Sequence, residues 1–193
     1  MPGSARTEGI EDLAHRRVGA AQAGNGGAFG ELVRPHQQAA LRVATVVLGT
    51  SEGADDVVQH AIERAWRAVR TFDADRPFGP WFLRIVANCA RNDRRSRGRR
   101  GRLQVRVASV PEAVVITPDQ IAVADEDRQR VVDAMNRLSR ADRLVIALRF
   151  FEEMNEHDMA ETLDCRAGTV KSRLSRAMSR LRTELERTEI DDA

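Results

Sequence analysis

The densest pattern of side chains able to do chemistry lies near the C-terminus, in GTVKSRLSRAMSRLR at residues 168–182. Residues 166–182 hold six basic residues and no acid. Apolar residues recur at three- and four-residue steps from Val170 to Leu181, which predicts a helix with one inward face. The outward face carries hydroxyl and basic groups that can bind phosphates and base edges: Thr169, Lys171, Ser172, Arg173, Ser175 and Arg176.

The residues before this helix predict a helix-turn-helix. A short helix is expected at 156–163, followed by a tight turn at 164–167. In such a motif the second helix enters the major groove and the first crosses the backbone. A solvated basic helix of an ordinary bundle is the alternative. The turn and the missing acids favour DNA binding.

A second candidate surface lies on the helix predicted to start near Pro77. Its apolar stripe from Phe78 to Cys89 faces inward, and the opposite side carries Arg84, Asn88, Arg91, Asn92 and Arg95. Residues 91–106 add eight arginines against one acid. Phe72 and Trp81 are candidates for stacking on an unpaired base, although spacing favours the core for the aromatic residues of the stripe.

Enzymatic chemistry finds no support in the sequence. The four histidines lie in separate polar segments, and the two cysteines, Cys89 and Cys165, form no metal-ligand pattern. Cys89 lies on the apolar stripe and is expected to be a core thiol. No phosphate-binding glycine motif or nucleophile elbow is present. We therefore expect a protein that is not an enzyme and has no cofactor or metal.

Composition predicts an all-α chain of two small helical domains. Of the 193 residues, 42% are hydrophobic, only 4% are aromatic and none is tyrosine, and strands would favour aromatic residues. All but one of the 31 basic residues are arginine. No apolar run approaches the roughly 18 residues of a membrane span, so we expect no membrane insertion and a cytoplasmic location.

The helix boundaries carry local signals. Helical spacing runs over 29–48 with a break expected near Pro35, and Gly49 predicts a helix end with Thr50 or Ser51 capping the next helix. Ser139 is the expected N-cap of a later helix, with Asp142 at its third position. Residues 101–124 predict an extended linker, with a weak strand pattern at Val105 to Val107.

Two longer segments resemble the extracytoplasmic-function (ECF) sigma factors of bacterial RNA polymerase. ADDVVQHAIERAWRA and RPFGPWFLRIVANCARNDRRSR are similar to sigma domain two, and LSRADRLVIALRFFEEMNEHDMAETLDCRAGTVKSRLSRAMSRLR is similar to sigma domain four. The resemblance implies domain two at 10–100, a linker at 101–124 and domain four at 125–188. It also implies core RNA polymerase, promoter DNA and an anti-sigma factor as partners.

The resemblance assigns roles to particular residues. Domain four is expected to recognise the minus-thirty-five element through Thr169 to Arg176 and to meet the flap region of polymerase. The resemblance assigns contact with the clamp helices of the largest polymerase subunit to Asp56, Gln59 and Glu63. It assigns recognition of the minus-ten element, including capture of a flipped base, to Phe72, Asp73, Arg76, Arg84, Asn88, Arg91 and Arg95.

Three departures from the family pattern bear on these contacts. Gln59-His60 replaces the usual Gln-Glu pair, NEHDMAE replaces a segment that commonly has an aromatic residue and two acids, and Asp164 stands where the turn commonly has glycine. A second interpretation stays open: a stand-alone helix-turn-helix regulator with an N-terminal sensing or dimerising domain. An arginine and asparagine face beside an arginine tract favours the sigma factor.

Overall fold

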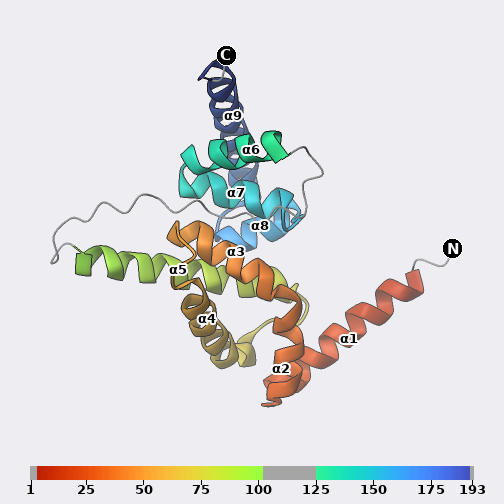
Figure 1. Ribbon diagram of the computed structural model, residues 1–193. Coiled ribbons are helices and arrows are strands. Elements are labelled where there is room, and N and C mark those ends of the chain that lie inside the picture. Colours follow the sequence, from red (N-terminus) through yellow and green to blue (C-terminus); the bar gives the residue numbers. More distant parts are fainter. Residues whose placement is uncertain (1–3, 102–124, 192–193) are drawn as a thin grey trace.

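The computed structural model describes residues 4–101 and 125–191, and all of their regular secondary structure is helical (Figure 1). No strand occurs in these two ranges, which confirms the expected all-α class with two helical units. The weak strand pattern at Val105 to Val107 and the linker lie outside the described residues. The helices of the first unit are α1 (Ser4–Gln22), α2 (Gly26–Val33), η1 (Arg34–His36), α3 (Gln37–Leu48), α4 (Ala54–Ala68), η2 (Val69–Thr71) and α5 (Phe78–Gly101).

The first unit is built around α5, which packs against both α3 and α4. Its stripe residues Phe82 and Val86 are fully buried, as the apolar spacing predicts. Phe29 of α2 meets Phe78 edge-on with ring centroids 6.2 Å apart, which ties the N-terminal helices to this core. The inward face of α5 is therefore fixed, and its opposite face is left for other contacts.

Local sequence signals explain where the helices of the first unit end. Pro35 lies in the short 3-10 turn η1, which separates α2 from α3 as expected. Gly49 ends α3 in the left-handed conformation at φ 82°, where a side chain is disfavoured. The expected N-cap of α4 was wrong: the cap is Gly53 with φ 77°, and the Thr50 hydroxyl instead accepts from the Glu52 amide.

The second unit consists of four helices, all of which contact α9 or its partner α7. Leu148, Met159, Val170 and Ala177 form its buried centre. Ser139 caps α7 as expected, its hydroxyl accepting from the Asp142 amide at 3.2 Å. The helices are α6 (Asp125–Arg137), α7 (Arg140–Phe150), α8 (Glu156–Leu163) and α9 (Ala167–Asp191).

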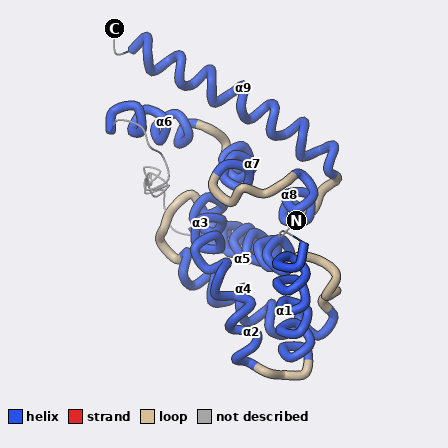
Figure 2. Tube along the Cα trace, turned by 90° about the vertical axis from the view of Figure 1, so that its right-hand side faces the viewer, coloured by secondary structure: helices blue, strands red, loops and turns tan. Residues whose placement is uncertain are grey.

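The two units pack directly on each other. Helix α8 lies against α5, and α7 lies against α3 (Figures 1 and 2). The far end of α9 points away from the first unit (Figure 1). This docking was not predicted from the sequence, and it decides which candidate DNA-binding residues are accessible.

Candidate nucleic-acid interface

The outward face of α5 presents the polar residues that the sequence singled out. Asn88 is exposed, and its Oδ1 accepts from Arg91 Nη1 at 2.8 Å. Arg95 is exposed and Arg91 is half-buried. The steps of four, three and four residues from Arg84 to Arg95 place these side chains along one side of the helix. That side combines an amide with guanidinium groups, as recognition of nucleic acid requires.

The loop before α5 does not display its aromatic ring. Phe72 is 6% exposed, and its ring centroid lies 4.6 Å from that of Trp81. Gln22 of α1 donates a hydrogen bond to the Phe72 carbonyl at 2.8 Å, which fixes the loop to the N-terminal helix. Phe72 and Trp81 therefore belong to the core in this arrangement, and neither ring is placed to stack on a base.

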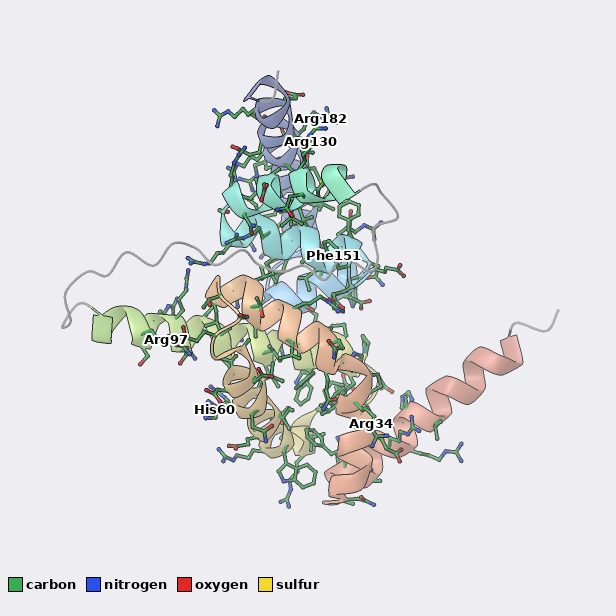
Figure 3. The ribbon with its side chains drawn as sticks, in the orientation of Figure 1. Arg34, His60, Arg97, Arg130, Phe151 and Arg182 are labelled. Atoms are coloured by element: carbon green, nitrogen blue, oxygen red, sulfur yellow. The ribbon has the colours of Figure 1, made fainter. Side chains whose placement is uncertain are left out.

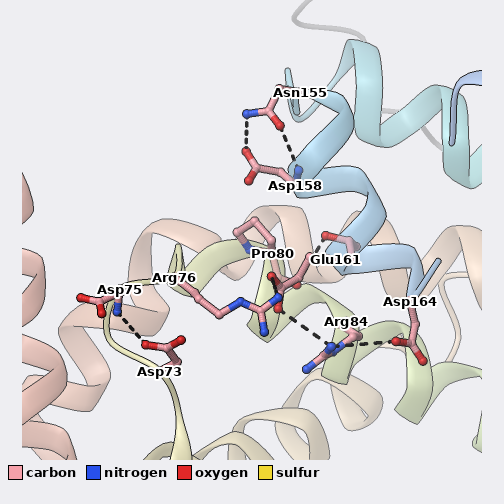
Figure 4. Close-up of polar contacts among 10 residues, drawn as sticks. Asp73, Asp75, Arg76, Pro80, Arg84, Asn155, Asp158, Glu161 and Asp164 are labelled. Atoms are coloured by element: carbon pink, nitrogen blue, oxygen red, sulfur yellow. Dashed lines mark hydrogen bonds and ion pairs between the residues drawn. The ribbon is translucent and has the colours of Figure 1, made fainter. Parts of the chain in front are cut away.

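The polar residues of that loop are more accessible. Asp73 is exposed, and its Oδ1 accepts from the Asp75 amide at 3.1 Å, which forms a tight Asx turn. Arg76 projects from the loop toward the second unit (Figure 4). The loop thus has a fixed backbone with one long basic side chain directed across the contact between the units.

The recognition helix α9 has the two-sided character that its spacing predicts. Lys171, Ser172 and Arg173 are exposed, as are Ser175 and Arg176, whereas Val170 and Ala177 are completely buried. Thr169, at the helix start, is half-buried. The Arg176 Nε donates to the Ser172 carbonyl at 3.1 Å, so this side chain lies along its own helix. The exposed donors form one continuous surface at the start of α9.

The turn between α8 and α9 has left-handed geometry without a glycine. Asp164 adopts φ 52° and ψ 53°, a conformation that asparagine and aspartate tolerate better than most residues. Its amide donates to the carbonyls of Ala160 and Glu161, which closes α8. The missing glycine therefore does not prevent the helix-turn-helix geometry.

Polar contacts between the units involve part of the candidate DNA-binding face. Arg76 Nη2 lies 2.5 Å from Glu161 Oε2, and Arg84 Nη1 lies 3.9 Å from both Glu161 Oε1 and Asp164 Oδ1 (Figure 4). The side chain of Glu161 is only 2% exposed. A buried carboxylate needs such partners, because removal from water is costly without them.

Further contacts reinforce this docking. Arg42 of α3 binds Glu152 through two hydrogen bonds of 2.6 and 3.0 Å. The hydroxyl of Thr162 is fully buried and donates to the Pro80 carbonyl at 3.4 Å. Glu152, Glu161 and Thr162 were missed by the sequence analysis, because no local pattern marks an acid or a hydroxyl whose partner is 82 to 110 positions away.

The candidate polymerase-binding residues lie on the solvent side of α4. Asp56, Gln59 and Glu63 are all exposed, and Glu63 lies 3.7 Å from Arg67 one turn later. His60 is exposed beside them (Figure 3). Within the described residues, α4 packs on α3, α5 and η2, and no helix of the second unit covers this face. It is therefore accessible while the two units are docked.

The buried thiol beside α4 is structural. Cys89 is 8% exposed, which confirms its expected place in the core. Burial raises the pKa of the Cys89 thiol, opposed by the charge of Arg64. Cys165 is partly exposed in the turn before α9. Within the described ranges, no group of three or more His, Cys, Asp and Glu side chains is arranged to hold a metal ion.

Comparison with known proteins decides between the two interpretations. The family model of sigma-70 region 2 matches residues 32–100, and that of sigma-70 region 4 matches residues 128–181. The RNA polymerase sigma factor NccH of Alcaligenes xylosoxydans xylosoxydans is 33% identical over 167 residues, which is 84% of this chain and 89% of NccH. This chain belongs to the ECF family of RNA polymerase sigma factors. The stand-alone regulator is not supported.

Other similar proteins support the assignment to the ECF sigma factors. The ECF sigma-E factor of Escherichia coli (strain K12) is 32% identical over 166 residues, covering 81% of this chain and 85% of that protein. Among solved structures, CnrH in complex with the cytosolic domain of CnrY has a TM-score of 0.64 at 30% identity and covers 90% of this chain and 97% of CnrH. RpoE in complex with the anti-sigma factor NepR, from Bartonella quintana, has a TM-score of 0.67 at 29% identity, with coverage of 82% and 96%.

As an ECF sigma factor, the protein binds core RNA polymerase and directs it to promoters. In its described parts, no helix is both long and apolar enough to cross a membrane. The first unit corresponds to region 2 and the second to region 4, and we call them domain two and domain four below.

Proposed function

We propose that α5 and its preceding loop contact the minus-ten element, and that the start of α9 contacts the minus-thirty-five element. The observation that supports this most is the exposed Asn88 beside Arg91 and Arg95 on a face that the core leaves free. An amide can discriminate bases, whereas guanidinium groups supply backbone affinity. On α9 the corresponding groups are Thr169, Lys171, Ser172, Arg173, Ser175 and Arg176.

Promoter binding then requires the two domains to separate. Arg76 and Arg84 are bound to acids of domain four, so the docked arrangement withholds part of the minus-ten face. Separation releases these two arginines, whereas most of the proposed DNA-contacting residues at the start of α9 are exposed already. We refer to the docked arrangement as the closed form.

In this proposal polymerase binds the exposed face of α4, which is accessible both in the closed form and after the domains separate. Asp56, Gln59 and Glu63 are exposed and acidic or polar, which suits a basic partner surface such as the clamp helices of the largest subunit. Domain four would meet the flap region. His60 removes one negative charge that the family usually has there, and the exposed Asp56 and Glu63 retain two.

An anti-sigma factor is the proposed inhibitor. CnrH and RpoE were each solved with a bound partner, the cytosolic domain of CnrY and the anti-sigma factor NepR. The close structural match to both supports an anti-sigma factor for this chain. Such a partner would act by covering polymerase-binding surfaces and by favouring the closed form.

Co-elution with core RNA polymerase tests the placement of the polymerase surface. The full chain is expected to form a stable complex, and a triple variant Asp56→Ala, Gln59→Ala, Glu63→Ala is expected to lose it while keeping its helical circular-dichroism spectrum. A matched triple change on exposed α9 residues, Lys171→Ala, Ser172→Ala and Ser175→Ala, should leave co-elution intact. Loss of the complex only in the α9 variant would overturn the assignment.

A further inference from the structure

A basic cleft lies between the two domains of the closed form. Its volume is about 620 Å³, and residues of α3, α5, α6, α7, α8 and α9 line it. The lining includes six arginines, and none of the lining residues that the structure describes is an acid. Domain two supplies three of these arginines and domain four the other three: Arg91, Arg94, Arg95, Arg140, Arg143 and Arg173.

Two of these guanidinium groups, those of Arg143 and Arg91, are wholly or partly removed from water. Arg143 is 6% exposed, and its Nε has no hydrogen-bond partner among the residues that the structure describes. Its Nη1 makes only long contacts to Asn136, 3.3 Å to the carbonyl and 3.4 Å to Oδ1. Burial lowers the pKa of Arg143, and the charge of Arg140 lowers it further. A buried cation of this kind favours an anionic partner.

Arg91, on the opposite wall, is half-buried and donates to Asn88 Oδ1 at 2.8 Å. Burial has the largest effect and lowers the pKa of Arg91; Asp164 opposes this, and the charges of Arg173, Arg95 and Arg94 lower the pKa further. Asp164 is exposed and already faces Arg84. Arginines of both domains therefore repel one another across the cleft.

The acid between Arg140 and Arg143 in the sequence does not relieve the repulsion. Asp142, in the first turn of α7, is not among the lining residues and is bound to Arg180 at 2.7 Å. The closed form thus brings together like charges that a bound anion would neutralise. Guanidinium forks fit phosphate oxygens in a bidentate manner, and several such forks from facing walls suit a chain of phosphates.

We propose that the cleft binds a small ligand with consecutive phosphate groups, either a free polyphosphate chain or the phosphate tail of a nucleotide, and that this ligand stabilises the closed form. A cleft of about 620 Å³ lies within the range for small molecules and is too small for a DNA duplex. Because both domains supply the donors, the complete site exists only when they are docked. A ligand that binds one state selectively shifts the equilibrium toward it.

The regulatory consequence rests on the proposed function. Arg91, Arg95 and Arg173 belong both to the cleft and to the proposed promoter-binding set. A phosphate ligand held in the cleft would therefore compete with promoter DNA for the same side chains. Binding itself needs neither polymerase nor a promoter, so it can be tested separately.

Calorimetric titration of the full chain with sodium tripolyphosphate at physiological salt is the direct test. Saturable binding is expected, and the double variant Arg94→Gln, Arg140→Gln should bind at least about tenfold more weakly. Both side chains are exposed, so the fold should be retained. The matched control is Arg34→Gln, Arg182→Gln, which removes one exposed arginine from each domain away from the cleft (Figure 3).

The control distinguishes a site from general attraction of polyanions to arginine. Equal weakening in the two double variants, or no saturable binding by the unaltered chain, would overturn the proposal. Hydrogen exchange gives the second readout: amides of α8 should exchange more slowly with tripolyphosphate present. Faster exchange there would contradict stabilisation of the closed form.

A nucleoside triphosphate distinguishes the two sources of the ligand. Affinity higher than that of tripolyphosphate would support the site and assign it to a nucleotide, and equal affinity would support it and assign it to the phosphate chain. A failure of the proposed function would look different. The chain would then bind tripolyphosphate normally and fail to support transcription with core polymerase.

Discussion

Arg76 of domain two and Glu161 of domain four form an ion pair, with Nη2 and Oε2 2.5 Å apart across the contact between the domains. Arg76 lies in the loop proposed to meet the minus-ten element, whereas Glu161 is a buried residue of the helix that precedes the recognition helix. One contact thus links the two promoter-binding regions in a form in which the minus-ten region is not fully accessible.

Replacing this acid should favour domain separation. Glu161→Gln keeps the shape of the side chain and removes the charge that holds Arg76 and Arg84. A charge-assisted hydrogen bond contributes roughly 1 to 3 kcal/mol, and the lower end applies because the Arg76 side chain is 47% exposed. Amides of α8 should exchange faster, and the free protein should bind promoter DNA several-fold more tightly.

The control for this change is Glu156→Gln, at the exposed start of the same helix. It should alter neither quantity. Unchanged exchange and DNA affinity in Glu161→Gln would show that the ion pair does not hold the closed form together.

Asn88→Ala tests base recognition by α5. The variant should lose promoter opening, because the amide is proposed to contact a base, while co-elution with core polymerase persists. Permanganate footprinting of the melted region measures opening. A variant that no longer binds polymerase would mean that this face of α5 belongs to the polymerase contact.

Arg176 and Arg180 should separate recognition from stability. Arg176→Ala should weaken binding to the specific promoter by about 1–3 kcal/mol while leaving unrelated DNA unaffected. Arg180→Ala should lower the free energy of unfolding, because Arg180 binds the buried Asp142 at 2.7 Å. Equal loss across all DNAs in Arg176→Ala would reassign that side chain to phosphate.

Asp164 offers a test of the turn. Asp164→Gly should relieve a left-handed backbone cost of about 1 kcal/mol and raise the melting temperature, while it removes the charge facing Arg84. Asp164→Asn is the matched control, because it removes the charge and keeps a side chain that tolerates this conformation. A lower melting temperature for glycine than for asparagine would show that the turn is not strained.

The burial of His36 predicts that the stability of the protein depends on pH. Burial lowers the pKa of His36 below the ordinary value of 6.5, and the charge of Glu152 partly opposes this. The folded protein therefore takes up the proton less readily than the unfolded chain, and stability should fall as pH drops below 6.5. Denaturant unfolding at several pH values, compared with His36→Asn, measures it. An equal pH dependence in both proteins would exclude His36 as the cause.

The sequence predicted those features whose structure is determined by residues close to one another in the chain. The buried stripe of α5, the end of α3 at Gly49 and the Ser139 cap all follow from local spacing and backbone chemistry. The predicted hydroxyl cap of α4 was wrong, because the residue directly before the helix is Gly53 in the left-handed conformation, which favours glycine over Thr50 or Ser51. Phe72 is buried because α1, for which the sequence analysis made no prediction, holds its carbonyl through Gln22.

The docking of the domains lay beyond sequence reasoning for a physical reason. Arg42 with Glu152 and Arg76 with Glu161 are pairs of ordinary charged residues separated by 110 and 85 positions. Nothing in either local sequence distinguishes them from solvated surface charges. The arginine cleft likewise exists only after docking, when Arg140 and Arg143, which the sequence analysis did not single out, face the arginines of α5.

In vitro transcription of genomic fragments with core RNA polymerase and the purified chain tests the central claim most directly. Sequencing of the transcript starts should show a shared two-part promoter, with Asn88→Ala reducing starts and Arg176→Ala changing the preference at the upstream part. An absence of promoter-dependent transcripts, with specific binding of the free protein to duplex DNA, would contradict the account.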